Sequence, residues 1–318
     1  MAGQCFGGEA VRIAIIGAGG VGGYFGGRLA AAGEDVVFIA RGAHLAALRS
    51  EGLRVKSANG DLVLAVNATD DPAAAGTAHV VMIATKLWST DEAIAAARVL
   101  LDPAGCVVSF QNGIEAEDRL VEAFGAAQVL GGVANIAAAI DSPGVIRHTG
   151  TMALLQFGEL DNAHSPRVLA LLEACRRAGI EARIPDDIHK ALWEKFVFLA
   201  SLSGMTTLVR LPLGPIRQDP DTRALFRQLA AEVVAVGAAR GVALNDATVD
   251  LVMKRLDTLP AQMHASMLGD LQRGLRLELP WLSGAVVREG ERLGVATPGH
   301  RFVYVALKLH ADGRPTPS

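Results

Sequence analysis

A glycine cluster that follows a short apolar run constrains the fold of this chain more than any other feature. Residues 11–16 (VRIAII) are rich in β-branched residues, and seven of the eleven residues from 17 to 27 are glycine. The run predicts a buried strand, and residues 19–32 predict a helix that ends at Gly33. Gly17, Gly19 and Gly22 therefore form a G-x-G-x-x-G motif between a strand and a helix, an arrangement typical of dinucleotide-binding domains.

Each glycine of this motif has a predicted task. Gly17 allows the tight turn, Gly19 lets the backbone approach a pyrophosphate, and Gly22 lets the helix pack closely on the strand. The helix N-terminus adds N–H groups and the positive end of the helix dipole. We expect the cofactor-binding loop to comprise Gly17, Ala18, Gly19, Gly20, Val21 and Gly22. The other glycines of the cluster are expected to serve helix packing: Gly23, Gly26 and Gly27. A glycine-rich loop without a ligand is the alternative.

An arginine after the second predicted strand indicates which cofactor binds. Residues 36–40 predict that strand, and Arg41 follows it, 19 residues after Gly22. An acidic residue in this region would accept hydrogen bonds from the ribose 2′-hydroxyl of NAD, whereas an arginine favours the 2′-phosphate of NADP. The sequence therefore predicts NADP(H), with His44 as a neighbour that could assist. A solvated loop arginine is the alternative.

Composition argues against several other classes of protein. The length of 318 residues predicts about two domains, and 51% hydrophobic against 20% charged residues argues against disorder. The net charge of −3 gives no reason to expect a nucleic acid or a membrane surface as a partner. Cys5, Cys106 and Cys175 lie far apart without metal-ligand spacing, so we expect neither a disulfide framework nor a metal site.

We expect a cytoplasmic protein, because the separated cysteines suit a reducing compartment and no segment predicts export. The first ten residues contain no basic stretch followed by a long apolar stretch, so we expect no secretory signal. The uncharged, apolar run at residues 196–209 has 14 residues and is too short to span a bilayer. We expect it to form a buried helix.

The first half of the chain predicts an α/β domain of the Rossmann type. Further buried strands are expected at residues 79–84, 106–110 and 129–133, and helices at 91–101 and 115–124. Strict alternation of strand and helix implies a doubly wound parallel sheet with helices on both faces. The turn Ser142-Pro143-Gly144 predicts antiparallel strands that extend this sheet.

The second half predicts an all-helical domain. Helical spacing relates Leu225, Leu229, Val233 and Val236. A capped helix is expected from residues 245–246 to about residue 259, and two more at 280–293 and 300–310. We expect no strand after about residue 184. The predicted domains are an NADP-binding Rossmann domain over residues 1–187 and an all-α substrate-binding and catalytic domain over residues 188–318.

Polar residues follow two more of the predicted strands. Lys86 follows residues 79–85, and Gln111-Asn112-Gly113 follows residues 106–110. Ligands of open α/β sheets bind beyond the carboxyl ends of the strands, so both segments are expected near the cofactor. Ordinary turn chemistry is the alternative, because Asn-Gly is a common turn sequence.

One lysine interrupts the apolar helix of the second half. Lys195 shares a helix face with Leu199 and Ser203. Such a lysine can extend its ammonium group to solvent, or it can act as a general acid, because burial lowers the pKa of an ammonium group. Ser266 and Glu278 follow downstream; taken singly, they read as surface residues.

The order of these motifs resembles that of the ketopantoate reductase (2-dehydropantoate 2-reductase) family, over roughly residues 11–309. The motifs are GAGGVG at 17–22, the basic Arg41, ATK with Lys86, QNG at 111–113, WEK ending at Lys195, SML from Ser266, and the later LELPWLSG and GVATPGH. Each is modest by itself, and their order and spacing make the resemblance specific.

This resemblance implies NADPH-dependent reduction of a 2-keto acid to a 2-hydroxy acid, in a cleft between the two domains, and the pantothenate biosynthesis that the family serves. Lys195 would be the general acid that protonates the developing alkoxide. Glu278 would hold lysine and substrate in place, and Ser266 would bind the substrate carboxylate. Asn112 and Lys86 would lie at the junction of nicotinamide and substrate.

The chain departs from the family pattern at two substrate positions. The family has asparagines one and two helical turns after the catalytic lysine, where this chain has Leu199 and Ser203. Leucine cannot form a hydrogen bond, and serine reaches less far. Because a lost hydrogen bond can change discrimination by orders of magnitude, we expect a keto acid with a more apolar or differently shaped side chain than ketopantoate.

Two other functions are compatible with the sequence. One is a different dehydrogenase that joins a Rossmann domain to a helical domain, of the opine or 3-hydroxyacid type. The other is an NADP(H) redox sensor that binds the cofactor without turnover. Whether the protein is a keto-acid reductase or another dehydrogenase, its expected partner is a small-molecule substrate. A homodimer is also compatible with the many apolar helix faces of the second half.

Overall fold

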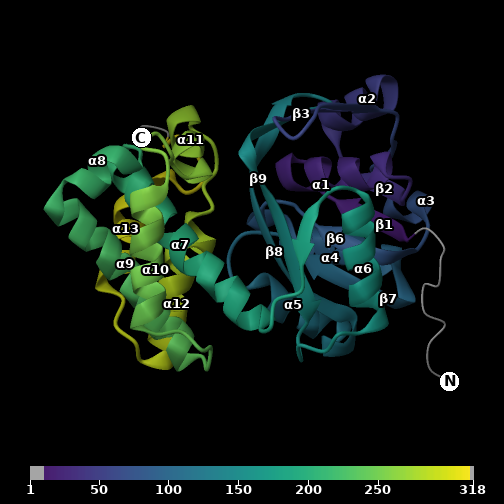
Figure 1. Cartoon of the computed structure of the whole chain (residues 1–318). Coiled ribbons are helices and arrows are strands. Elements are labelled where there is room, and N and C mark those ends of the chain that lie inside the picture. The colour runs from purple at the N-terminus through teal and green to yellow at the C-terminus, as the bar shows by residue number, and fades with distance from the viewer. Residues whose placement is uncertain (1–10, 316–318) are drawn as a thin grey trace. The chain divides into compact units, whose positions relative to one another are not determined.

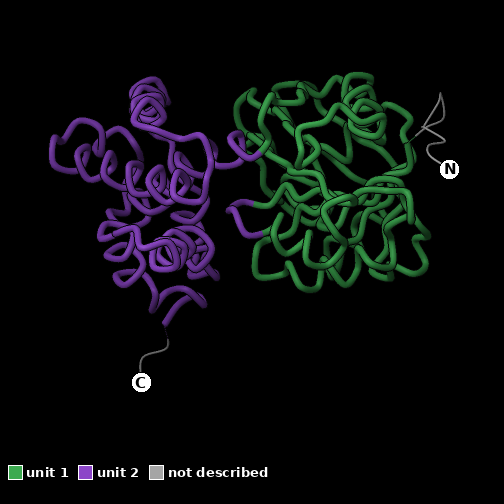
Figure 2. Tube along the Cα trace, turned by 90° about the horizontal axis from the view of Figure 1, so that it is seen from below, with its two compact units in different colours: residues 1–111, 116–188 green, residues 112–115, 189–318 purple. Residues whose placement is uncertain are grey.

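A computed structural model describes residues 11–315 of the chain, so Cys5 lies outside the described residues. The chain divides into two compact units (Figure 2). Unit 1 holds the residues up to 111 together with 116–188, and unit 2 holds 112–115 together with those from 189 onward. The predicted domain boundary places residues 112–115 in the first domain. They belong with the helical unit because Ile114 is buried in the apolar core of that unit.

Unit 1 is a ten-stranded mixed sheet with helices on both faces (Figure 1). Six neighbouring strands of this sheet run parallel to one another: β1 (Arg12–Ile16), β2 (Asp35–Ile39), β5 (Asn67–Thr69), β6 (Ala78–Ile83), β7 (Leu101–Ser109) and β8 (Val129–Ser142). They lie in the order β5-β2-β1-β6-β7-β8, with parallel pairing at each step. This is the 3-2-1-4-5-6 order of the Rossmann fold, which confirms the predicted fold class.

An antiparallel extension completes the sheet. The predicted turn is confirmed, because Ser142 pairs with Val145 at the tip of a hairpin between β8 and β9 (Val145–Glu159). Beyond β9 follow β3 (Leu53–Lys56) and β4 (Leu62–Leu64), and β10 (Glu181–Arg183) also pairs with β9. The expected strict alternation of strand and helix was wrong here. In β3 buried and exposed residues alternate, the pattern of a short strand that is covered on one face only.

Helices cover both faces of the central strands, which explains their continuous apolar sequences. In β1, Ile13 and Ile15 belong to one core, and Ala14 and Ile16 belong to the other. The first core is closed by α1 (Gly20–Ala31), α2 (Gly42–Glu51) and α6 (Pro166–Arg177). The second is closed by α3 (Pro72–Ala75), α4 (Thr90–Leu100) and α5 (Ala116–Phe124). The helices α2, α3 and α6 lie in segments for which the sequence analysis predicted no element.

Unit 2 contains only helices among its described residues, as predicted. They are α7 (Ile188–Val209), α8 (Leu213–Gln218), α9 (Pro220–Ala239), α10 (Asp246–Thr258), α11 (Ser266–Arg273), α12 (Ser283–Leu293) and α13 (Pro298–Leu307). The predicted cap of α10 is confirmed as a capping box at Asn245. The helix expected from residue 280 begins at Ser283 instead, because a 3₁₀ turn (Leu279–Trp281) ends at Leu282, whose backbone is not helical.

Helix α7 lies at the centre of the core of unit 2. Trp193 contacts α9 so closely that a Cβ atom on Gly237 would lie 2.7 Å from its ring. Phe196, Val197 and Met205 are buried in the same core. None of the described helices combines the length and the apolar character that crossing a membrane requires.

A neutral histidine is part of this core. The Nε2 atom of His300 lies 3.1 Å from the Leu229 carbonyl, which can only accept, so Nε2 carries the proton. The Nδ1 atom then accepts from the Ser283 hydroxyl at 3.2 Å. Burial lowers the pKa of His300 to about 4, so its neutral form is the one that fits the core.

Acid is expected to destabilise the fold through His300. The unfolded chain protonates this histidine near pH 6.5, whereas the folded protein does so only near pH 4. Between these values the unfolded state binds more protons, so the free energy of unfolding falls as pH falls. The His300 share between pH 7 and pH 5 is about 2 kcal/mol. Urea unfolding at both pH values should show a loss about 2 kcal/mol smaller for His300→Gln. Equal losses in both proteins would contradict the prediction.

Candidate active site

The glycine-rich loop leaves open space where a phosphate is expected. A Cβ atom on Gly19 would meet no described atom within 4 Å, whereas one on Gly22 would lie 2.1 Å from the Gly17 carbonyl oxygen. Gly17 has a φ of +97°, which suits glycine. No side chain caps the N-terminus of α1 at Gly19. The geometry therefore fits the tasks predicted for the three glycines: a turn, an open approach and close helix–strand packing.

The remaining glycines of the cluster pack α1 against the sheet. A Cβ atom on Gly23 would lie 2.7 Å from Ile146, one on Gly26 2.7 Å from Phe38, and one on Gly27 2.8 Å from Leu53. Gly20 has a similar constraint, because its Cβ would lie 2.1 Å from the Ala138 carbonyl oxygen of β8. The packing interpretation of Gly23, Gly26 and Gly27 thus agrees with the structure. Gly20, predicted as part of the cofactor loop, is also required for contact with β8.

His44 connects the glycine-rich loop to a neighbouring hairpin. Its Nδ1 atom accepts from the Gly144 N–H at 3.0 Å, so its Nε2–H donates to the Ala18 carbonyl at 2.8 Å. Burial lowers the pKa of His44, which favours this neutral form. The imidazole therefore ties the G-x-G-x-x-G loop to the tip of the β8–β9 hairpin. The sequence had indicated His44 only as a neighbour of the phosphate site, since its pairing with Gly144 depends on residues 100 positions apart.

Arg41 lies at the carboxyl end of β2, where it precedes α2. Its guanidinium donates to the Glu92 carboxylate at 2.7 Å, and both side chains are largely exposed. A surface ion pair of this kind contributes at most about 1 kcal/mol. A ligand phosphate can therefore replace Glu92 at little cost.

Gln111 joins the ends of two neighbouring strands. Its side-chain amide donates to the Thr85 carbonyl at 3.2 Å and to the Lys86 carbonyl at 3.3 Å. It also donates to the Thr90 hydroxyl at 3.1 Å. These bonds fix the loops after β6 and β7 at the carboxyl edge of the sheet, where ligands of this fold bind. Lys86 itself is exposed, with its ammonium group 5.7 Å from the centre of the Trp88 ring.

The predicted catalytic lysine forms a hydrogen bond with another predicted site residue. The Lys195 ammonium group donates to the Asn112 side-chain carbonyl at 3.1 Å. Two further contacts hold the segment 112–115 in unit 2: Ile114 is buried in the core, and Glu115 pairs with Arg288 at 2.7 Å. Gly113 has a φ of +93°, which allows the chain to turn there.

The other predicted substrate residues differ widely in burial. Leu199 is half-buried and packs against the apolar core of unit 2, and Ser203 is only 1% exposed. Ser266 is exposed at the first position of α11, and Glu278 is buried before the 3₁₀ turn. A substrate can reach Ser266 directly, whereas Ser203 is covered by protein atoms.

The buried cysteines are not candidates for catalysis. Burial raises the pKa of both thiols, Cys106 and Cys175, to about 12, so both are protonated at neutral pH. The nucleophilic form of cysteine is the thiolate.

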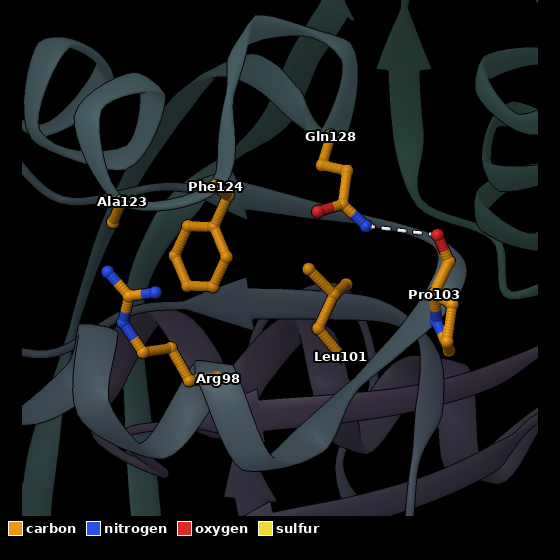
Figure 3. A pocket seen from close by; sticks show the side chains of 6 residues that line it. All are labelled: Arg98, Leu101, Pro103, Ala123, Phe124 and Gln128. Carbon is orange, nitrogen blue, oxygen red and sulfur yellow. Dashed lines mark hydrogen bonds between the residues drawn. The ribbon is translucent and has the colours of Figure 1, made fainter.

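A hollow of about 320 Å³ in unit 1 is lined by none of the predicted site residues (Figure 3). It adjoins the start of β7 and the ends of α4 and α5, with the Arg98 guanidinium 5.3 Å from the centre of the Phe124 ring. This is the amino edge of the parallel strands, opposite to the edge at which ligands of doubly wound sheets bind.

Comparisons with known proteins agree with this arrangement. A model of the family described as ketopantoate reductase PanE/ApbA matches residues 13–162, and a model of its C-terminal domain matches residues 187–311. The chain belongs to the ketopantoate reductase family. The match covers both units, so the resemblance inferred from the motifs is confirmed.

Similar members of the ketopantoate reductase family align with nearly the whole chain. The chain is 32% identical to uncharacterized oxidoreductase YkpB of Bacillus subtilis (strain 168), covering 94% of this chain and 99% of that protein. It is 32% identical to 2-dehydropantoate 2-reductase of Archaeoglobus fulgidus, over 89% and 92% of the two chains. The crystal structure of 2-dehydropantoate 2-reductase from Geobacter metallireducens GS-15 matches with a TM-score of 0.87 at 31% identity, over 94% and 99%. The chain is therefore an oxidoreductase.

Proposed function

We propose that this protein reduces a 2-keto acid to the 2-hydroxy acid with NADPH, and that Lys195 is the general acid. NADPH, when bound, supplies the hydride that reaches the carbonyl carbon. The Lys195 ammonium group stabilises the negative charge on the carbonyl oxygen and donates a proton to it. The products are the 2-hydroxy acid and NADP⁺, and solvent restores the proton on the lysine.

The hydrogen bond between Lys195 and Asn112 carries this proposal. It joins the two motifs, WEK and QNG, to which the resemblance assigns the substrate. An ammonium group has three N–H donors. When the asparagine carbonyl accepts from one of them, the other two point away from the asparagine. The same bond would keep the lysine at one position while a substrate enters.

The remaining residues take the roles that the family motifs indicate. Ser266 would bind the substrate carboxylate, and Glu278 would hold lysine and substrate in place. The loop Gly17–Gly22 would bind the pyrophosphate, with Lys86 and Asn112 next to the nicotinamide. The open space at Gly19 and the uncapped N-terminus of α1 support the cofactor assignment.

Ketopantoate is not the preferred substrate in this proposal. Leu199 and Ser203 stand where the family has asparagines, and Leu199 already packs against apolar side chains. We expect kcat/KM for 2-keto acids with apolar side chains to exceed that for ketopantoate by about 10-fold or more. NADPH consumption with a panel of keto acids measures this ratio. Leu199→Asn should shift the ratio towards ketopantoate, and a wild-type preference for ketopantoate would contradict the substrate assignment.

Arg41 would select NADPH over NADH. Arg41→Asp removes a charge-assisted contact to the 2′-phosphate and adds a repelling charge, so Kd for NADPH should rise about 10- to 100-fold while Kd for NADH stays the same or falls. Fluorescence titration with both cofactors measures the two values. Arg49→Asp is the matched control, since Arg49 is an exposed arginine of α2, the helix that follows Arg41, and pairs with Asp70. An unchanged Kd for NADPH in Arg41→Asp would exclude this role.

A further inference from the structure

Arg255 differs from the other arginines of residues 11–315 in being half-buried without a hydrogen-bond or ion-pair partner. Most of them donate to carboxylates or carbonyls, as Arg217 does to the Leu259 carbonyl at 2.7 Å. The arginines of the described residues that also lack such a partner are exposed to solvent: Arg98, Arg210 and Arg314. Water can therefore accept hydrogen bonds from those three guanidinium groups, whereas it reaches the half-buried guanidinium of Arg255 only in part.

The Arg255 guanidinium lies on an aromatic ring instead of beside an acid. Its central carbon is 4.4 Å from the centre of the Phe198 ring. Burial lowers the pKa of Arg255, and no described acid compensates the lost hydration. The contact with Phe198 offsets part of this cost and fixes the plane of the guanidinium. The guanidinium presents its N–H donors as a planar fork. Because this fork is held in place and pairs with no acid among the described residues, it suits the carboxylate of a bound ligand.

The ring beneath this fork belongs to the helix that carries Lys195, α7. Phe198 follows Lys195 by three residues on α7, so their side chains are neighbours. Thr206, about two further turns along α7, accepts a hydrogen bond at 3.4 Å from the N–H of Ala265, which precedes Ser266. Phe198, with Arg255 over its ring, thus lies between Lys195 and Thr206 along α7, and all of these residues belong to unit 2.

We propose that Arg255 binds a carboxylate of the keto-acid substrate. The proposal rests on the proposed function and names the group that compensates the loss of the family's asparagines. Leu199 removes a hydrogen bond to the substrate, and the bidentate contact from Arg255 supplies a stronger one from the neighbouring helix α10. The site then binds the acid end of the substrate firmly and contacts the remainder through apolar groups.

Kinetics of Arg255→Met test this role. Methionine keeps an unbranched apolar stem over Phe198 but removes the charge. We expect KM for 2-keto acids to rise about 10- to 1,000-fold, while Kd for NADPH stays unchanged. Arg255→Lys should recover only part of the loss, because an ammonium group cannot form the planar fork. Arg210→Met is the matched control, since Arg210 is an unpaired but exposed arginine of the same unit, and its KM should equal that of the wild type.

Stability separates a binding role from a structural one. Because Arg255 has no described acid partner, removing its charge should leave the urea midpoint unchanged or raise it. Oxalate, a carboxylate that cannot be reduced here, should raise the thermal midpoint of the wild type but not of Arg255→Met. A lower urea midpoint together with an unchanged KM would assign Arg255 to packing and overturn the proposal.

Two substrates distinguish which carboxylate binds. If Arg255 takes the carboxylate next to the keto group, Arg255→Met raises KM equally for 2-oxobutanoate and 2-oxoglutarate. If only 2-oxoglutarate is affected, Arg255 takes a second carboxylate, which would contradict this inference and the expected preference for apolar side chains. Failure of the wild type to reduce any keto acid would contradict the proposed function, whereas turnover with an unchanged KM in Arg255→Met would contradict only this inference.

Discussion

Lys195→Ala should lower kcat by about 10²- to 10⁴-fold and leave Kd for NADPH unchanged. The lysine is the only ammonium group to which we assign a proton transfer, and it contacts Asn112 rather than any residue of the glycine-rich loop. Its loss therefore removes charge stabilisation and proton donation at the carbonyl oxygen but not the cofactor site. Steady-state kinetics with the preferred keto acid and fluorescence titration with NADPH measure the two quantities.

A second lysine of the same helix provides the control for this experiment. Lys190 lies on α7 and pairs with Glu194 at 3.8 Å, with both side chains exposed. Lys190→Ala should keep the wild-type kcat. Full activity in Lys195→Ala would exclude the lysine as general acid. Cofactor binding by a wild type that reduces no keto acid would favour the redox sensor.

Gly19→Ala and Gly22→Ala should have opposite effects on binding and stability. Gly19 has a φ of −75°, which alanine adopts freely, and its new Cβ would meet no described atom within 4 Å. We expect an unchanged free energy of unfolding and a Kd for NADPH that rises about 10-fold or more, because the methyl group occupies space needed by the pyrophosphate. Gly22→Ala should instead lower the free energy of unfolding by about 2 kcal/mol or more, since its Cβ would lie 2.1 Å from the Gly17 carbonyl oxygen.

Urea unfolding and NADPH titration of both variants measure these effects. Gly33→Ala is a less suitable control, because Gly33 has a φ of +92° and alanine would be strained there. Gly269→Ala in unit 2 is better, since its Cβ would also meet no described atom within 4 Å. It should change neither quantity. Tight NADPH binding by Gly19→Ala would contradict the assignment of this loop to the pyrophosphate.

Much of unit 1 was predictable because its central strands are buried on both faces. Such strands read as continuous apolar runs, and β1, β2, β6 and β7 were found in this way. The short strands β3, β4 and β5 were missed. They have three or four residues each, so too few residues show the pattern by which a strand is identified.

The geometry of the glycine-rich loop was predictable because the motif carries it. The G-x-G-x-x-G spacing sets the turn, the open approach and the helix start within six residues, so local sequence suffices. The contacts of His44 and Arg255 were not predictable in this way. His44 depends on Gly144, and Arg255 on the ring of Phe198, and each pair is brought together only by packing.

The sequence by itself determined the Rossmann-type sheet, the helical second half, the family and the candidate lysine, because these follow from periodicity and from motifs of a few residues. Only the tertiary structure decided that residues 112–115 belong with the helical unit and that Asn112 meets Lys195. It also decided that Arg255 is half-buried over the ring of Phe198 and pairs with no acid among residues 11–315. A hydrogen bond or a missing counter-charge is a property of atoms in space, and the residues concerned lie tens of positions apart in the chain.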